Sequence, residues 1–198
     1  MKRKLVFLAL AAFGLASCNG FKKGDGGLLY NIIVDKGGPS IKPGDFVSLN
    51  LTLKNDADSV IGSTYEMGHP AMQLMQKPQA KGDIYQGLQM LSEGDSAIIK
   101  LNIDTLTKGR QRPPNMKGKY QVYVVKVEKV IAKGSLSDQV FQGRLTEYVK
   151  SIEETAKKSE PGNIKKYIAD KKLNVTKTDS GLYYVITQQG TGIKPVAG

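Results

Sequence analysis

The sequence predicts a mixed α+β fold, and three observations lead to that prediction. Runs of alternating or β-branched apolar residues, separated by turns rich in Gly, Pro and Asp, extend from about residue 28 to 131 and indicate strands. One segment within that region, 83–90, has the pattern of a short helix. After residue 131 the apolar residues recur every three or four positions, which is typical of helices. We therefore expect a strand-rich domain followed by helices.

The first seventeen residues have the pattern of an export signal. Basic residues at positions 2–4 precede an apolar run from Leu5 to Leu15, which is too short to cross a bilayer, since that takes about 20 residues. The run ends in Leu15-Ala16-Ser17-Cys18, which resembles the lipobox of bacterial lipoproteins. This resemblance implies that Cys18 carries the lipid and becomes the new N-terminus. The alternative is a plain secretory signal in which Cys18 is incidental.

The residues after Cys18 predict where the protein is held. Asn19 occupies the position at which an Asp is the usual inner-membrane retention signal, so the resemblance favours an anchor in the outer membrane, facing the periplasm or the cell surface. Residues 18–27 are rich in Gly and polar residues, which predicts a flexible tether. The membrane is therefore an expected partner through the lipid on Cys18.

Composition excludes several function classes. The chain contains one Cys and one His, so a disulfide framework, a Cys-cluster zinc site and a multi-His metal site are not expected. The net charge of +11 falls to about +8 when the basic residues of the signal are removed. Because export separates the chain from cytoplasmic nucleic acid, we do not predict nucleic acid as a partner.

Four strands and one short helix are expected in the first domain. The strands span residues 28–34, 46–53, 97–103 and 120–131, and the helix at 83–90 begins after Asp83, a favourable N-cap. Val47, Leu49, Leu51 and Leu53 alternate with polar residues, as expected of a half-buried strand. The segment 68–82 is expected to be irregular or partly helical, and 108–119 forms a basic loop.

A helical linker is predicted from residue 132 to 174. Its first helix ends at the turn-forming sequence Glu160-Pro161-Gly162-Asn163, and a second short helix runs to about Lys172. The segment 175–198 then repeats the beginning of the first domain: Gly181-Leu182-Tyr183-Tyr184-Val185-Ile186 has the pattern of Gly27-Leu28-Leu29-Tyr30-Asn31-Ile32. We expect the start of a second, truncated domain of the same type, or alternatively a tail that adds an edge strand or completes a partner's sheet.

Three motifs in residues 28–131 resemble the FKBP-type peptidyl-prolyl cis–trans isomerases. They are Lys42-Pro43-Gly44-Asp45 before a strand, the run from Gly87 to Ala97 (GLQMLSEGDSA), and Pro113-Pro114 before the last strand. The resemblance implies an antiparallel sheet wrapped on the short helix. The order of signal, divergent domain, helical linker and second domain is similar to that of Bacteroidetes-type lipoproteins.

The resemblance also implies a function, namely isomerisation of X–Pro bonds in unfolded or exported proteins. The barrier to that rotation is about 18–20 kcal/mol. An apolar pocket stabilises the twisted amide without a nucleophile, metal or cofactor, so none is expected. The alternative is a non-catalytic peptide-binding or chaperone module that positions a catalytic second domain.

The family's pocket residues map onto a mostly aliphatic set in this chain. By resemblance the pocket consists of Leu51, Ile61, Ile84, Leu88, Leu106 and Tyr123. The family's Phe-Asp pair is Ile61-Gly62 here, and its Trp is Ile84, in a chain without Trp. For Leu51, Ile84 and Leu88 a place in the plain core is an equally valid interpretation. Tyr85, beside the floor position, is expected to be exposed.

Overall fold

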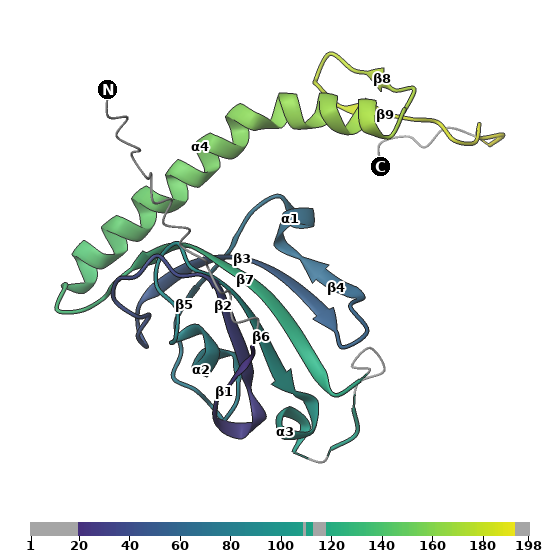
Figure 1. Cartoon of the computed structure of the whole chain (residues 1–198). Helices are drawn as coiled ribbons and strands as arrows, with labels where there is room; N and C mark the ends of the chain where they lie inside the picture. Colours follow the sequence, from purple (N-terminus) through teal and green to yellow (C-terminus); the bar gives the residue numbers. More distant parts are fainter. Residues whose placement is uncertain (1–19, 109, 113–117, 193–198) are drawn as a thin grey trace, which may run out of the picture. The chain divides into compact units, whose positions relative to one another are not determined.

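The computed structural model describes residues 20–108, 110–112 and 118–192 of the chain, which divides into two compact units after Phe141. Unit 1 contains an antiparallel sheet with short helices, and unit 2 contains most of a long helix and a small hairpin (Figure 1). This arrangement confirms the predicted α+β fold class. Within the described residues, no helix is long and apolar enough to cross a membrane.

The sheet of unit 1 is antiparallel throughout. Its strands are β1 (Lys22–Lys23), β2 (Leu29–Val34), β3 (Phe46–Asn55), β4 (Val60–Ser63), β5 (Ala71–Leu74), β6 (Ser96–Asn102) and β7 (Tyr120–Ile131). They lie in the order β1-β2-β6-β7-β3-β4, and β5 pairs with the first half of β3. The helices are α1 (Thr64–Met67), α2 (Ile84–Leu88), α3 (Ile103–Thr107) and the 3-10 turn η1 (Asp25–Gly27). Six of these elements, β1, η1, β4, α1, β5 and α3, were not predicted from the sequence, and β5 lies in the segment 68–82 that was expected to be irregular or partly helical.

Alternation of buried and half-buried residues along the central strands places the core on one face of the sheet. In β6, the side chains of Ala97, Ile99 and Leu101 are each 1% exposed, whereas the residues between them are half-buried. Val125 and Val127 of β7 face the same core. The strand prediction for these segments is confirmed, and burial along β6 has the period of two that is typical of a strand.

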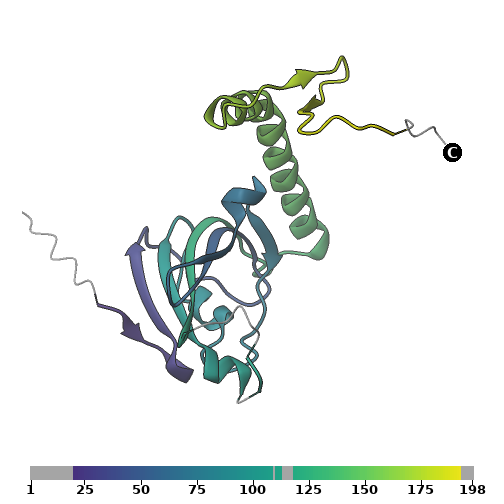
Figure 2. The same cartoon turned by 90° about the vertical axis from the view of Figure 1, so that its right-hand side faces the viewer.

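Helix α2 packs against the core face of the sheet, which curves around it (Figures 1 and 2). A Cβ atom on Gly87 would lie 2.9 Å from Cγ2 of Ile99, so only a glycine lets the helix approach β6 this closely. Leu88, the next residue, is 2% exposed and belongs to the core. The Gly87-Leu88 sequence therefore sets the distance between helix and sheet.

The segment from Lys22 to Gly27 differs from the expected tether. Lys22 and Lys23 form β1 and pair with Tyr30 and Leu29, and residues 25–27 form η1. The positive φ of Gly26 brings this turn against the backbone of Lys81, where a Cβ would lie 2.3 Å from the Lys81 carbonyl oxygen. The glycines that suggested flexibility are thus required by a close turn.

The linker contains one continuous helix, α4 (Asp138–Asp170), so the predicted end at residues 160–163 is wrong. Pro161 lies inside it. A proline removes one backbone hydrogen bond and crowds the preceding turn, which bends a helix without necessarily ending it. Figure 2 shows such a change of direction in the C-terminal half of α4. Beyond α4, β8 (Thr176–Lys177) and β9 (Tyr183–Tyr184) form a small hairpin.

Candidate functional site

The candidate site lies on the face of the sheet that α2 covers. The register places one residue from each of five strands in a row across the sheet, in the order Tyr30, Ile99, Tyr123, Leu53 and Gly62. Directly paired residues of antiparallel strands share a face. Since Ile99 faces the core beneath α2, the whole row faces that side.

A layer of half-buried side chains covers the buried core on this face. Tyr30 from β2, Ile84 and Tyr85 from α2, Leu106 from α3 and Tyr123 from β7 all pack against the core cluster. Each is only partly buried, so their outer atoms form an apolar surface contributed by four elements. We name these five residues the aromatic layer. A surface of this kind can hold an apolar or aromatic group of a ligand away from water.

Tyr123 is the polar residue of the aromatic layer whose environment is best defined. A tyrosine hydroxyl is neutral at physiological pH, and burial raises the pKa of the Tyr123 hydroxyl further above that range. The hydroxyl donates a hydrogen bond to Oε1 of Gln121, at 3.2 Å, and Gln121 is itself buried. Because its proton is used in this bond, the hydroxyl can only accept a hydrogen bond from a ligand. The face of the Tyr123 ring can make an apolar contact with the same ligand.

Asp83 fixes the position of Ile84 at the start of α2. Its Oδ1 accepts a hydrogen bond from the Gln86 amide at 3.0 Å, as an N-cap does. Its Oδ2 accepts from the amides of Gln79 and Ala80, at 2.5 and 3.1 Å. One buried carboxylate therefore secures both the helix and the loop before it, and the predicted cap is confirmed.

The structure brings together three of the six residues that the resemblance placed in the pocket. Ile84, Leu106 and Tyr123 belong to the aromatic layer, whereas Leu88 lies beneath it in the core. Leu51 pairs with Val125, one row away from Tyr123 on the same face, and is half-buried. Ile61 lies at an irregularity between β3 and β4 and is half-buried. Their joint role as a substrate pocket stays a prediction.

Two members of the layer were not predicted from the sequence. Tyr30 lies two residues after Leu28, which is fully buried, so the strand period could have placed it on the core face. Tyr85 was expected to be exposed but is half-buried against the core, because a one-turn helix lying flat on a sheet covers more than one of its own side chains. The described residues contain no group of three or more His, Cys, Asp or Glu side chains able to hold a metal.

Gly62 leaves space in the row that contains Tyr123. No heavy atom lies within 4 Å of the position that a Cβ would take at this residue. The FKBP resemblance implies an acidic side chain here. The chain therefore lacks the carboxylate at this position but has room for it.

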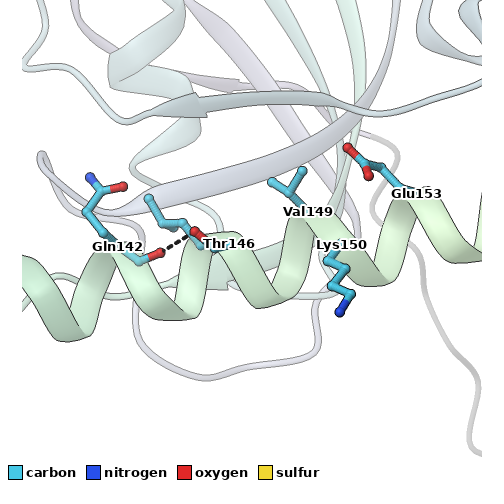
Figure 3. A pocket seen from close by; sticks show the side chains of 6 residues that line it. Gln142, Thr146, Val149, Lys150 and Glu153 are labelled. Carbon is cyan, nitrogen blue, oxygen red and sulfur yellow. Dashed lines mark hydrogen bonds between the residues drawn. The ribbon is translucent and has the colours of Figure 1, made fainter.

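Unit 2 contains a shallow concavity along α4 with a volume of about 560 Å³ (Figure 3). Leu145 and Val149 contribute its apolar lining, and Gln142, Thr146, Lys150 and Glu153 its polar lining. The hydroxyl of Thr146 donates to the carbonyl of Gln142 at 3.0 Å, an ordinary helical bond. This lining combines no set of groups specific to one ligand chemistry, in contrast to the aromatic layer.

No family model matches the chain, and a search of curated proteins finds no match. The chain is similar to the crystal structure of FkpA from Escherichia coli, with 20% identity, a TM-score of 0.48, and coverage of 57% of this chain and 52% of that one. It is also similar to the N-terminal domain of FKBP42 from Arabidopsis thaliana, with 14% identity, a TM-score of 0.44, and coverage of 53% and 87%. The chain thus spans about half the length of the FkpA structure. The second of these proteins is an FKBP by name.

Proposed function

We propose that unit 1 is a divergent FKBP-like module that binds proline-containing segments of unfolded or exported proteins and isomerises their X–Pro bonds. The observation that carries this proposal is the aromatic layer, whose half-buried side chains come from four elements and each pack against the same core. A proline ring is compact and apolar, and a surface of aromatic and aliphatic side chains suits it.

The physics of the reaction fits an apolar site. Rotation about the X–Pro bond breaks the conjugation of the amide and makes it less polar at the transition state. A site that excludes water therefore stabilises the twisted amide relative to the planar one, without any covalent step. The Tyr123 hydroxyl is neutral at physiological pH, with a pKa that burial raises further, so it places no charge against the proline ring.

A second candidate function, peptide binding without catalysis, is favoured by the gap at Gly62. The resemblance implies an acidic group at this position, and hydrogen bonds selective for the twisted amide add to the rate of such reactions. In this chain the hydroxyl of Tyr123 is already bonded to Gln121. A module with an apolar surface and few free polar groups would hold unfolded chains and suppress their aggregation.

Isomerase assays on the whole chain separate the two candidates. For the native chain we expect slow turnover of a short X-Pro peptide, measured by exchange NMR. Ile84→Asp is expected to lose both turnover and peptide binding, because a carboxylate in the aromatic layer is costly to desolvate. Ile186→Asp is the matched control, since Ile186 is 62% exposed in unit 2. Peptide binding that is lost in Ile84→Asp, without turnover in the native chain, supports the second candidate. Absence of both activities contradicts the proposal.

The Gly62→Asp variant tests the catalytic part directly. The open space at this position accommodates a side chain. If the first domain is an isomerase limited by a missing carboxylate, Gly62→Asp raises kcat/KM by about tenfold or more while peptide affinity changes little, as expected of a group that acts only on the transition state. An unchanged rate in a folded variant indicates that the aromatic layer serves binding alone.

We further propose that the protein is lipid-anchored through Cys18 to the outer membrane, on its periplasmic or surface side. Cys18 lies outside the described residues, and the support is the lipobox-like sequence before it. Labelling of cells with a palmitate analogue is expected to mark the native chain but not Cys18→Ser. Membrane fractionation then assigns the compartment, and label retained on Cys18→Ser would contradict the proposal.

A further inference from the structure

The edge of the sheet at β1 carries a group of lysines next to an aromatic ring. β1 is the terminal strand of the sheet order, and both Lys22 and Lys23 are exposed. Nζ of Lys100, on β6, lies 4.6 Å from the centre of the Phe21 ring. Phe21 is 37% exposed, so part of its ring stays accessible beside Lys100.

The register places most of this group on one face. Lys23 pairs with Leu29, and Leu29 pairs with Lys100, so these three residues lie in one row on the face opposite the aromatic layer. Phe21 reaches the same row through its contact with Lys100. Lys22, paired with Tyr30, adds a charge on the other side of the edge strand. We name Phe21, Lys22, Lys23 and Lys100 the β1 patch.

The charges of the β1 patch are not balanced by carboxylates. Among the residues that the structure describes, none of its three lysines takes part in an ion pair, whereas Lys126, Lys129 and Lys133 of the same unit each do. Asp25 follows closely in the chain and accepts a hydrogen bond from the Gln86 side chain. The β1 patch therefore presents a net positive surface with one aromatic ring.

The distance along the chain keeps the β1 patch close to Cys18. Four Cα–Cα steps separate Cys18 from Lys22, and a fully extended chain advances at most about 3.6 Å per residue, which gives a span of about 14 Å or less. Electrostatic attraction to a charged surface acts over a Debye length of about 8–10 Å. If Cys18 is held in a bilayer by its lipid, the lysines of β1 lie within reach of the headgroups.

We propose that the β1 patch docks unit 1 onto the phosphate-bearing headgroups of the membrane that holds the lipid on Cys18. This inference rests on the proposed lipid anchor. The cations lie against the phosphates and Phe21 enters the interface, where aromatic rings are favoured. Phe21, Lys23 and Lys100 belong to the face of the sheet opposite the aromatic layer, so docking through these three residues leaves the layer open to polypeptide clients. Lysines on an edge strand also prevent strand pairing between molecules, so the experiment must separate the two roles.

The absence of Trp from the chain makes Phe21→Trp a single-residue reporter. The variant is expressed as a whole chain, purified as the processed protein, and reconstituted into vesicles of phosphatidylcholine alone or with phosphatidylglycerol. We expect a blue-shifted emission that is quenched by brominated lipids in the anionic vesicles, and reversal of both effects by high salt. Tyr167→Trp, at a position 59% exposed on α4, is the matched reporter and is expected to show neither effect.

Charge variants measure the contribution of the lysines. Each lysine near an anionic surface strengthens binding about fivefold, so Lys22→Gln with Lys23→Gln lowers the ratio of docked to undocked reporter roughly 25-fold. Lys157→Gln with Lys158→Gln removes the same charge from exposed positions on α4 and is expected to leave the ratio unchanged. An equal loss in both double variants would show a dependence on net charge alone and overturn the proposal.

A second readout keeps the proposal testable if the reporter disturbs the fold. In the native chain, amine-reactive labelling followed by mass spectrometry is expected to show Lys23 and Lys100 protected in anionic vesicles and reactive in neutral ones. Equal reactivity in both would overturn the docking. Palmitate labelling, measured on the same samples, shows whether the lipid is present, so a missing anchor is distinguished from a lipidated chain that fails to dock.

Discussion

Two segments of this molecule share a sequence pattern but differ in environment. Gly27 to Ile32 contributes to β2, which has β1 and β6 as neighbours, and Leu28 is fully buried. Gly181 to Ile186 contains β9, which pairs only with the two-residue β8, and Leu182 and Ile186 are each 62% exposed. An apolar strand pattern therefore supplies side chains that can form a core. Whether these side chains are buried depends on the strands and helices that pack beside the segment.

The segment from Gly181 to Ile186 does make some apolar contacts. With the C-terminal turns of α4 it lines a concavity of about 400 Å³, formed by Ile164, Tyr167, Ile168, Leu173, Val175, Tyr183, Tyr184 and Val185 with Asn163. Ile164 and Ile168 are half-buried, while Tyr167 is exposed. Unit 2 therefore forms a partial core, in which helix and hairpin cover one another on one side only.

The largest effect is expected from matched leucine truncations in the two segments. Leu28→Ala leaves a cavity in a closed core and is expected to cost about 2–5 kcal/mol of unfolding free energy. Leu182→Ala removes a side chain that is mostly exposed and is expected to change stability by no more than about 0.5 kcal/mol. Urea unfolding of each whole-chain variant measures the two costs, with amide exchange monitored in β6 for Leu28→Ala and in α4 for Leu182→Ala. Equal costs would contradict the comparison, since they would require Leu182 to be buried in solution.

Matched glycine substitutions test the packing of the helices and come next in size. Gly87→Ala places a Cβ 2.9 Å from Ile99, which is itself buried and cannot yield, and is expected to cost about 1–3 kcal/mol. Gly162→Ala, in α4, meets no atom within 4 Å and is expected to stabilise the helix by about 0.5–1 kcal/mol. Thermal unfolding followed at 222 nm gives the sign of each. A stabilising Gly87→Ala would show that α2 lies farther from β6 than in the structure.

The structure could be predicted from the sequence where a local pattern decided it, and not where contacts between distant residues did. The runs of apolar and β-branched residues in 97–103 and 120–131 located β6 and β7, because both strands contribute to the core. Asp83 indicated the start of α2 because it caps this helix. The segment 22–27 was misjudged because its glycines fit a close turn against Lys81, a contact between residues distant in sequence. The break at Pro161 was wrong because the residues around it continue the helical hydrogen bonds.

Prediction of the candidate site was limited in the same way. The resemblance identified Ile84, Leu106 and Tyr123, but alignment to a motif cannot separate Leu88, which lies in the core, from residues one layer above it. Tyr30 and Tyr85 join the layer through the curvature of the sheet around α2 and the flat packing of that helix. The strand period from Leu28 is a local signal for Tyr30, whereas the packing of Tyr85 is set by the whole fold and leaves no local signal in the sequence.

The smallest effect concerns the pH dependence that Tyr123 imposes on stability. Burial raises the pKa of its hydroxyl above the unfolded value of about 10, so the unfolded chain loses this proton first as the pH rises. The contribution to stability is therefore fully present below about pH 10 and is lost as the pH rises through the folded pKa. Tyr123→Phe should flatten the decline of unfolding free energy above pH 10, while costing about 0.5–1.5 kcal/mol at neutral pH through the lost bond to Gln121.

Tyr167→Phe, at an exposed position of unit 2, is expected to leave the pH profile of the native chain unchanged. Urea titrations at a series of alkaline pH values measure the slopes. Equal slopes for Tyr123→Phe and the native chain would place the hydroxyl in solvent, and the aromatic layer would then be more open than its packing against the core indicates.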